Sequence, residues 1–187
     1  FSVDISISSL KKGYNFSKKN NINNIHYVNC DIFDEPFKES VFDYVISLGV
    51  LHHTKDPYES FKLISKNLKE NGYIIIGLYN SIGRLRTYFR KFIYKYISKD
   101  VVNYFDPVLR KIGKTNKKKF KAWIKDQYLH ISETGHTFDE ILNWFKKNDI
   151  EFINSLPAIN LMNYNDYENL FKKQLQGNYI ERLFTQL

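Results

Sequence analysis

The chain has 187 residues, and its 43% hydrophobic and 17% aromatic content is too high for an intrinsically disordered protein. No run reaches the roughly 18 apolar residues that a membrane-spanning helix needs. The one cysteine, Cys30, permits no internal disulfide, and no leader pattern follows Phe1, so we expect a cytoplasmic protein whose front has been cut.

The net charge of +8 is concentrated in one stretch. Residues 84–126 hold about 14 basic and 3 acidic side chains, whereas the remainder is slightly acidic. A regional excess of this kind indicates an anionic partner, such as a phosphate group, a nucleic acid or a lipid surface. A composition bias of the source organism is the alternative explanation, and the sequence leaves both open.

Strands and helices alternate in the first half of the chain, which predicts an α/β fold with a mostly parallel sheet. The β-branched, aromatic and uninterrupted apolar runs are typical of strands, the later ones buried on both faces. A helix follows the first strand, and another begins at Pro57 and ends near Gly72. We predict four strands, around Asp4 and at residues 25–31, 41–50 and 72–80.

After Gly83 the pattern becomes helical. Apolar residues recur every three or four positions over residues 85–97, with arginine and lysine between them, which predicts a basic amphipathic helix. We expect a loop over residues 111–121, followed by a second basic helix that contains Trp123 and Tyr128.

The last part of the chain returns to an α/β pattern. Thr137 and Glu140 form a capping-box pattern at the start of a helix, and a strand is expected from Glu151. The predicted regions are a core at 1–80, a basic helical insertion or lid at 81–136, a return to the core at 137–160 and a C-terminal helical tail at 161–187.

Two carboxylates lie at predicted strand ends, Asp4 on the first strand and Asp31 on the second. Because the carboxyl ends of parallel strands meet at one edge of a sheet, we expect both at a ligand-binding edge. The two acceptor oxygens of a carboxylate suit the two hydroxyls of a ribose, which is the role we expect for Asp4. We expect Asp31 to accept a hydrogen bond from the exocyclic amine of adenine. Aspartate is also a common turn former at strand ends, so each signal is weak alone.

Taken in order, these blocks resemble the class I S-adenosylmethionine-dependent methyltransferases, and among them the small-molecule type that includes the ubiquinone and menaquinone biosynthesis enzymes. The resemblance runs from Phe1 to about Asn80 and rests on VDIS, NCDIF, FDYVISLGVLHHTKDP and NGYIIIGLYN. It implies a Rossmann-like, doubly wound sheet and S-adenosylmethionine as cofactor. The implied cofactor-binding residues are Asp4, Ile5, Cys30, Asp31, Ile32, Leu48 and Gly49.

The first strand of that family and its G-x-G-x-G loop have no counterpart, because none of the 8 glycines forms even a G-x-G pair. We therefore expect an N-terminally incomplete domain that binds cofactor poorly. Since the missing strand would lie between those of Asp4 and Tyr44, its loss should split the sheet and leave unpaired edges. A rearranged sheet in which those two strands pair directly is the alternative.

His52 and His53 follow the third predicted strand, where an imidazole could deprotonate a methyl acceptor, so they are the candidate catalytic residues. Packing against the cofactor or the next helix is the alternative. Methyl transfer is an in-line displacement, so positioning the donor and the acceptor can supply most of the acceleration. The candidate substrate-binding residues are Tyr79, Arg84, Tyr128, His130 and His136.

The sequence thus predicts methyl transfer to a small or lipid-like acceptor, without a metal. His130, Glu133 and His136 are spaced three apart, which suits metal ligation on a helix poorly. An anionic membrane surface is a candidate partner of the basic helices, and nucleic acid is a weaker one. The alternative function is a non-catalytic module that uses those helices to bind nucleic acid or an anionic membrane surface.

Overall fold

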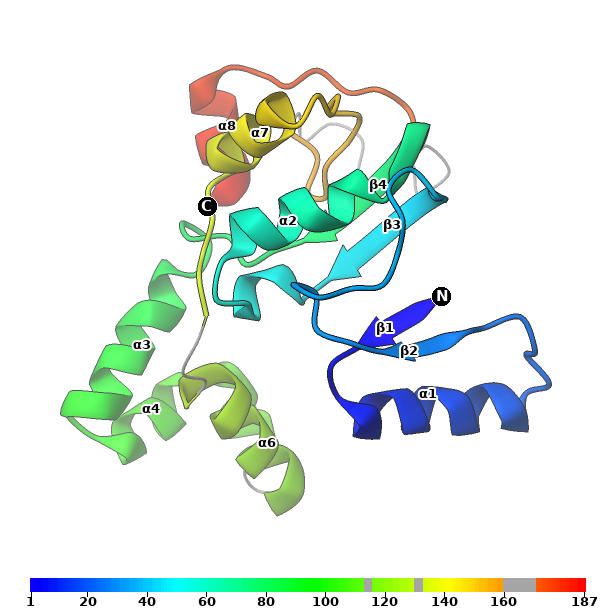
Figure 1. Ribbon diagram of the computed structural model, residues 1–187. Coiled ribbons are helices and arrows are strands. Elements are labelled where there is room, and N and C mark those ends of the chain that lie inside the picture. Colours follow the sequence, from blue (N-terminus) through cyan, green and yellow to red (C-terminus); the bar gives the residue numbers. More distant parts are fainter. Residues whose placement is uncertain (113–115, 130–132, 160–170) are drawn as a thin grey trace. The chain divides into compact units, whose positions relative to one another are not determined.

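A computed structural model describes residues 1–112, 116–129, 133–159 and 171–187 (Figure 1). The chain forms two compact units. The first unit comprises Phe1–Leu51 with Asp56–Ile76, and the second comprises His52–Lys55 with Gly77–Leu187. The four regions expected from the sequence are a different division and stay a prediction.

The first unit carries the strands. Its elements are β1 (Ser2–Asp4), α1 (Ile7–Lys19), β2 (Tyr27–Asn29), β3 (Phe42–Leu48), α2 (Pro57–Lys66) and β4 (Leu68–Gly77), the last ending at the boundary between the units. A short 3-10 helix, Leu51–His53, follows β3 where the sequence suggests a loop. Phe61 of α2 is fully buried. The alternation of strands and helices is confirmed.

The strands form two separate pairs rather than one sheet. β1 runs parallel to β2 with Asp4 opposite Asn29, and β3 pairs with β4. In the part of the chain that the structure describes, no pairing joins β1 to β3. The expected split of the sheet is therefore confirmed, and direct pairing of these strands is not observed. Tyr44, Ile46 and Leu48, which alternate along β3, are all more than half exposed.

Helix α2 ends earlier than its sequence pattern predicts. The carbonyl oxygens of Lys66 and Asn67 accept hydrogen bonds from backbone N–H groups of residues 40–42 at 2.8–2.9 Å. These bonds replace those that a continuing helix would make. As a result β4 begins at Leu68 rather than at Gly72.

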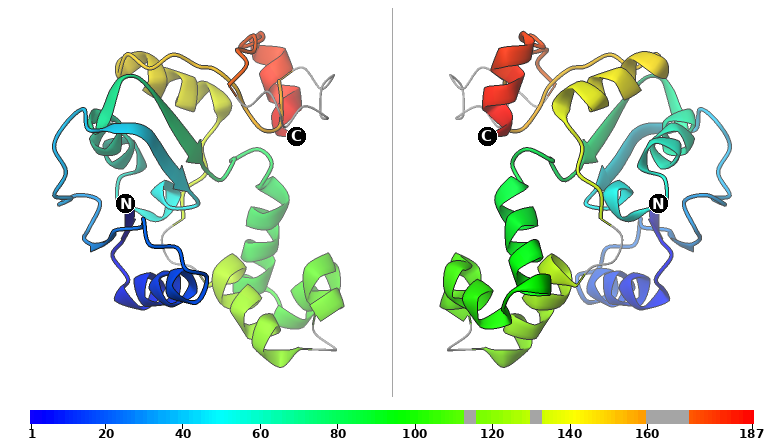
Figure 2. Two further views of the ribbon diagram at one scale, coloured as in Figure 1. Left: turned by 90° about the vertical axis from the view of Figure 1, so that its right-hand side faces the viewer. Right: turned by 90° about the vertical axis from the view of Figure 1, so that its left-hand side faces the viewer.

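The second unit is helical (Figure 2). Its elements are α3 (Leu85–Tyr96), α4 (Lys99–Phe105), α5 (Pro107–Ile112), α6 (Lys117–Tyr128), α7 (Phe138–Lys147) and α8 (Tyr179–Gln186). Helices α3 to α6 form a bundle, and α7 packs against α8. The bundle core consists of Val102, Leu109 and Tyr128. Both predicted basic helices are confirmed, as α3 and α6, whereas α4 and α5 were not predicted.

The loop expected over residues 111–121 is wrong at both ends, because α5 runs to Ile112 and α6 begins at Lys117. Oδ1 of Asn116 accepts the backbone N–H of Lys119 at 3.0 Å, an N-cap that starts α6 at Lys117. The lysine run therefore occupies the first turn of a helix.

The strand expected from Glu151 is also wrong, because residues 151–159 form no strand. The carbonyl oxygen of Ile153 accepts the N–H of Gln174 at 2.7 Å, and Phe152 packs edge-on against Phe138 of α7. Phe152 of this segment thus packs against a helix and not within a sheet. In the tail, α8 confirms a helix at 179–186, and residues 160–170 lie outside the described ranges.

Candidate functional site

Asp4 and Asp31 of the first unit lie at the same edge of the β1–β2 pair, which we call the carboxylate edge. Asp4 ends β1, and Asp31 stands two residues beyond β2. Oδ1 of Asp4 accepts the N–H of Ser6 at 2.8 Å, and Oδ1 of Asp31 accepts the N–H of Phe33 at 3.0 Å. Among the described residues, Oδ2 has no partner in either carboxylate. Each aspartate therefore keeps one oxygen for a ligand.

The turns around the carboxylate edge are held by Asn29. Its side-chain amide donates to the carbonyl oxygens of Asp4 and Ile5, both at 2.9 Å, and Ile5 remains largely exposed. Burial raises the pKa of the Cys30 thiol, and the neighbouring carboxylates of Glu35, Asp31 and Asp34 raise it further. Cys30 is therefore an uncharged, half-buried neighbour of Asp31, and Ile32 beside it is also half-buried.

Leu48 is the last residue of β3 in the same unit, and Gly49 follows it. The side chain of Leu48 is largely exposed, and Gly49 has a φ of 74°, in the left-handed region. A β-carbon at Gly49 would meet nothing within 4 Å, so this glycine satisfies a conformational need rather than a steric one. An adenine nucleoside needs hydrogen-bond acceptors for its hydroxyls and amine, apolar surface for its base and room for its atoms. The first unit offers all three, so it fits the implied cofactor.

His52, Tyr79, Arg84 and Glu133 come together in the second unit, and we call them the histidine–arginine cluster. The ring centroid of Tyr79 lies 3.9 Å from that of His52 and 3.7 Å from Cζ of Arg84. Because each face of a ring admits only one group this close, the imidazole and the guanidinium must cover opposite faces of Tyr79. His53 lies 4.2 Å from His52, centroid to centroid.

Glu133 is the charged centre of the cluster. Its side chain is 2% exposed; Oε1 lies 3.0 Å from Nη2 of Arg84, and Oε2 pairs with Lys91. Nη2 of Arg84 also donates to Gln127 at 3.3 Å. Two cations against one carboxylate leave one net positive charge in this buried group, which favours an anionic or electron-rich ligand.

The imidazole of His52 is 1% exposed, and neither ring nitrogen has a hydrogen-bond partner in the described part of the chain. Its backbone carbonyl oxygen, by contrast, accepts the N–H of Thr134 at 3.0 Å. Burial and then the neighbouring His53 lower the pKa of His52 to about 4. The ring is therefore neutral at pH 7, offers one donor and one acceptor, and is a weak base.

His136 lies beside the cluster but is fully engaged. Its Nε2 lies 2.9 Å from Oγ1 of Thr134, and its Nδ1 lies 2.9 Å from Oε1 of Glu140. Its backbone N–H donates to the carbonyl oxygen of Tyr79 at 2.9 Å. The predicted capping box is thus half formed, because Thr137 caps the N–H of Glu140 while the Glu140 carboxylate turns to His136.

Of the remaining predicted substrate-binding residues, one lies apart from the cluster and one is not among the residues that the structure describes. Tyr128 lies in the bundle core, where its hydroxyl donates to Asp106 at 2.5 Å, and His130 lies outside the described residues. Their roles stay predictions. Sequence reasoning considered Glu133 only as a metal ligand and missed its ion pair, which spans 49 positions. The predicted residues that the structure brings together are His52, His53, Tyr79, Arg84 and His136.

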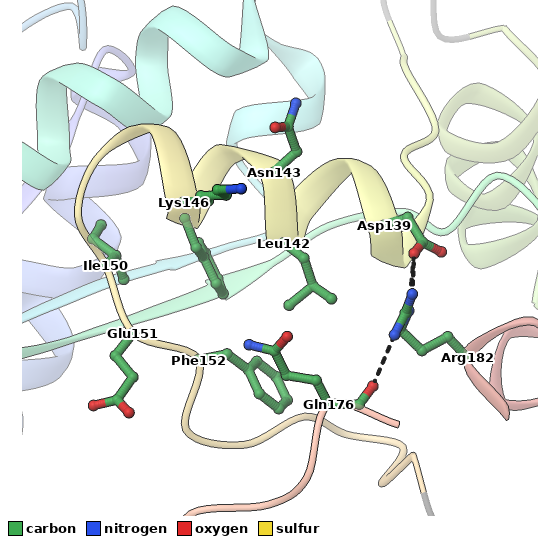
Figure 3. A pocket seen from close by; sticks show the side chains of 10 residues that line it. Asp139, Leu142, Asn143, Lys146, Ile150, Glu151, Phe152, Gln176 and Arg182 are labelled. Atoms are coloured by element: carbon green, nitrogen blue, oxygen red, sulfur yellow. Dashed lines mark hydrogen bonds and ion pairs between the residues drawn. The ribbon is translucent and has the colours of Figure 1, made fainter. Parts of the chain in front are cut away.

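A hollow of about 470 Å³ lies beside α7 in the second unit (Figure 3). Two of its charged residues pair with each other, because Arg182 bonds to Asp139 at 2.5 Å and also to the carbonyl oxygen of Gln176 at 3.2 Å. Lys146 and Glu151 also line the hollow, and Glu151 pairs with Lys173. Among the described side chains, no group of three or more His, Cys, Asp or Glu could hold a metal ion.

Comparisons with known proteins agree with this architecture. A family model described as a methyltransferase domain matches residues 1–104. PKMT2 from Rickettsia typhi is similar in structure with a TM-score of 0.61 at 18% identity, over 78% of this chain and 32% of that one. Its complex with AdoHcy gives a TM-score of 0.61 at 19% identity with the same coverage.

The YcgJ protein from Bacillus subtilis matches with a TM-score of 0.49 at 17% identity, over 78% of this chain and 50% of that one. The chain thus spans a third to a half of the length of these solved proteins. No curated protein sequence matches it. With more than half of its length matched by the family model, the chain belongs to the methyltransferase domain family, with a Rossmann-like α/β fold.

Proposed function

We propose that the protein transfers a methyl group from S-adenosylmethionine to a small or lipid-like acceptor. The carboxylate edge carries this proposal, because two aspartates with spare acceptor oxygens stand where the parallel strands β1 and β2 end. Membership of the methyltransferase family supports the same chemistry.

Each residue of the carboxylate edge has a defined task in this proposal. Asp4 accepts hydrogen bonds from the ribose hydroxyls, and Asp31 accepts one from the exocyclic amine of adenine. Ile5, Ile32 and Leu48 provide apolar surface for the base. The cofactor supplies an electrophilic methyl group on a sulfonium sulfur, so this chain has only to hold the donor and orient an acceptor.

The histidine–arginine cluster is the proposed acceptor site. A neutral His52 can hydrogen-bond an acceptor hydroxyl or amine, and the net positive charge beside it favours an electron-rich group. An imidazole with a pKa of about 4 removes a proton only weakly at pH 7. The role that we propose for His52 is therefore to orient the molecule that receives the methyl group. The acceptor proton then leaves to water.

NMR titration with S-adenosylhomocysteine tests the cofactor half, because chemical shifts detect weak binding. We expect the backbone amides of Asp4–Ser6 and Cys30–Phe33 to shift, and Asp4→Asn and Asp31→Asn to reduce those shifts. Lys12→Ala on the exposed side of α1 is the control that should leave them unchanged. A dispersed spectrum without shifts at the solubility limit of the ligand would refute this half.

Transfer from methyl-labelled S-adenosylmethionine tests the acceptor half. Catechol, ethanolamine and diacylglycerol present a phenol, an amine and a lipid hydroxyl. We expect label in one of them, and a loss of label in His52→Ala that His26→Ala at an exposed site does not show. Absence of transfer together with absence of amide shifts would favour the alternative, a non-catalytic binding module.

A further inference from the structure

Helix α3 of the second unit carries a row of exposed apolar side chains. Leu85, Phe89, Phe92 and Tyr96 stand at positions i, i+4, i+7 and i+11, so they share one face of the helix. Each is between 54% and 65% exposed. We call this row the aromatic stripe. An exposed row of large apolar side chains is unusual on a protein that works alone in water.

The bundle does not need the aromatic stripe for its own core. The inward face of α3 presents Ile93 and Tyr94, and the Tyr94 ring stacks on that of Tyr128 at 5.1 Å. Val102 and Leu109 complete that core and are 1% exposed. The stripe is therefore a second apolar face of the same helix, beside the one that packs on the bundle core.

Cationic side chains border the aromatic stripe. At 100° per residue, Arg86 and Lys95 fall on opposite sides of it, and both are exposed. Apolar side chains in the middle and cations at both borders are the pattern of a helix that lies in a lipid headgroup layer.

We propose that the aromatic stripe docks the protein onto an anionic lipid surface. The stripe enters the boundary between headgroups and acyl chains, and Arg86 and Lys95 meet anionic headgroups. Single-stranded nucleic acid is the less favoured partner, because the cations flank an unbroken apolar row instead of following a groove between stacking platforms. This proposal stands independently of methyl transfer. No helix in the described ranges is long and apolar enough to cross a membrane.

Sedimentation with extruded vesicles tests the proposal. Vesicles of phosphatidylcholine alone are compared with an equimolar mixture of phosphatidylcholine and phosphatidylglycerol. We expect binding to the anionic vesicles and at least about tenfold weaker binding for the double variant Phe89→Ser, Phe92→Ser. Arg86→Gln and Lys95→Gln should each weaken it about fivefold at low salt, and this charge effect should vanish at ~1 M NaCl.

Phe16→Ser is the matched control, because Phe16 on α1 is 64% exposed against 65% for Phe89. It should bind vesicles like the wild type, and circular dichroism should show that all variants are folded. Equal binding of the stripe variants and the wild type would overturn the proposal. So would binding of single-stranded DNA in preference to vesicles, or a wild-type dimer that the double variant converts to a monomer, since a second copy would then cover the stripe.

Discussion

The bundle of the second unit and the carboxylate edge of the first use aspartate in opposite ways. Asp106 is 2% exposed; Oδ1 accepts two backbone N–H groups at the start of α5, and Oδ2 accepts the Tyr128 hydroxyl at 2.5 Å and the Trp123 indole N–H at 3.1 Å. Asp4 gives one oxygen to a local N–H and keeps the other. The difference separates a carboxylate that stabilises the fold from one that can bind a ligand.

The contacts of Asp106 also shift its pKa and that of Tyr128. Burial raises the pKa of Asp106, but the bonds from Tyr128, from Trp123 and from the backbone outweigh it, so the pKa is lowered. Burial and the bond to Asp106 raise the pKa of Tyr128, which keeps the donor protonated. Because the folded pKa of Asp106 is lowered, its stabilisation is present above its unfolded pKa and is lost as the pH falls through the folded one.

Replacing Asp106 by alanine is the strongest way to break this comparison. The change leaves the Tyr128 hydroxyl, the Trp123 N–H and two backbone N–H groups without their acceptor in a buried place. We expect the free energy of unfolding, from urea denaturation, to fall by about 3–5 kcal/mol. Asp100→Ala, in the exposed first turn of α4, should cost less than about 1 kcal/mol. Equal losses would show that burial does not distinguish the two kinds of aspartate.

His52 extends the comparison to a buried ring whose nitrogens have no hydrogen-bond partner among the described residues. Its folded pKa of about 4 lies below the ordinary 6.5, so the unfolded chain takes up the proton first. Stability should be full above pH 6.5 and fall as the pH drops towards 4, by up to about 3 kcal/mol. In urea titrations at a series of pH values, His52→Gln should flatten this slope and His26→Gln should retain it. A flat wild-type profile would contradict the burial of a neutral ring.

Gly135 and Gly49 differ in how closely other atoms surround their α-carbons. A β-carbon at Gly135 would lie 2.9 Å from Cα of Ser81, so we expect Gly135→Ala to cost about 2–3 kcal/mol in the free energy of unfolding. Gly49→Ala meets no atom and should cost only about 1 kcal/mol, through its positive φ. Thermal unfolding of both variants measures the difference. The reverse order would mean that Gly49 is packed in solution.

The smallest effect on stability is expected at Asp4. Asparagine keeps an acceptor for the N–H of Ser6, so Asp4→Asn should change the free energy of unfolding by less than about 0.5 kcal/mol while it weakens the response to S-adenosylhomocysteine. Chemical denaturation provides the first quantity and the NMR titration the second. A loss of several kcal/mol would place Asp4 with Asp106, among the carboxylates that hold the fold.

Local patterns in the sequence predicted the elements whose causes are local. The cap at Thr137 and the apolar spacing of α3 depend on neighbours within one or two turns, and both are confirmed. The end of α2 depends instead on hydrogen bonds from residues 40–42, which no local pattern contains. Long-range pairing is therefore what the sequence could not supply.

The candidate site divides in the same way. Asp4 and Asp31 reach one edge because parallel strands end together, a rule that needs only the order of strands and helices along the chain. The cluster in the second unit depends on Arg84 meeting Glu133, 49 positions away, and no periodicity connects them. The buried hydrogen bond that Tyr128 makes was likewise not foreseen, since an aromatic residue with a polar tip is equally suited to a ligand contact and to such a bond.

The division of the strands into two pairs has a consequence for handling the protein. Among the described strands β3 pairs with β4 alone, so the other edge of β3 is a template on which another extended backbone can assemble, and the exposed side chains of Ile46 and Leu48 add apolar surface on one face. Concentrated solutions should therefore form fibrils or precipitate as storage time increases. A lysine at Ile46 would act as a gatekeeper against such growth.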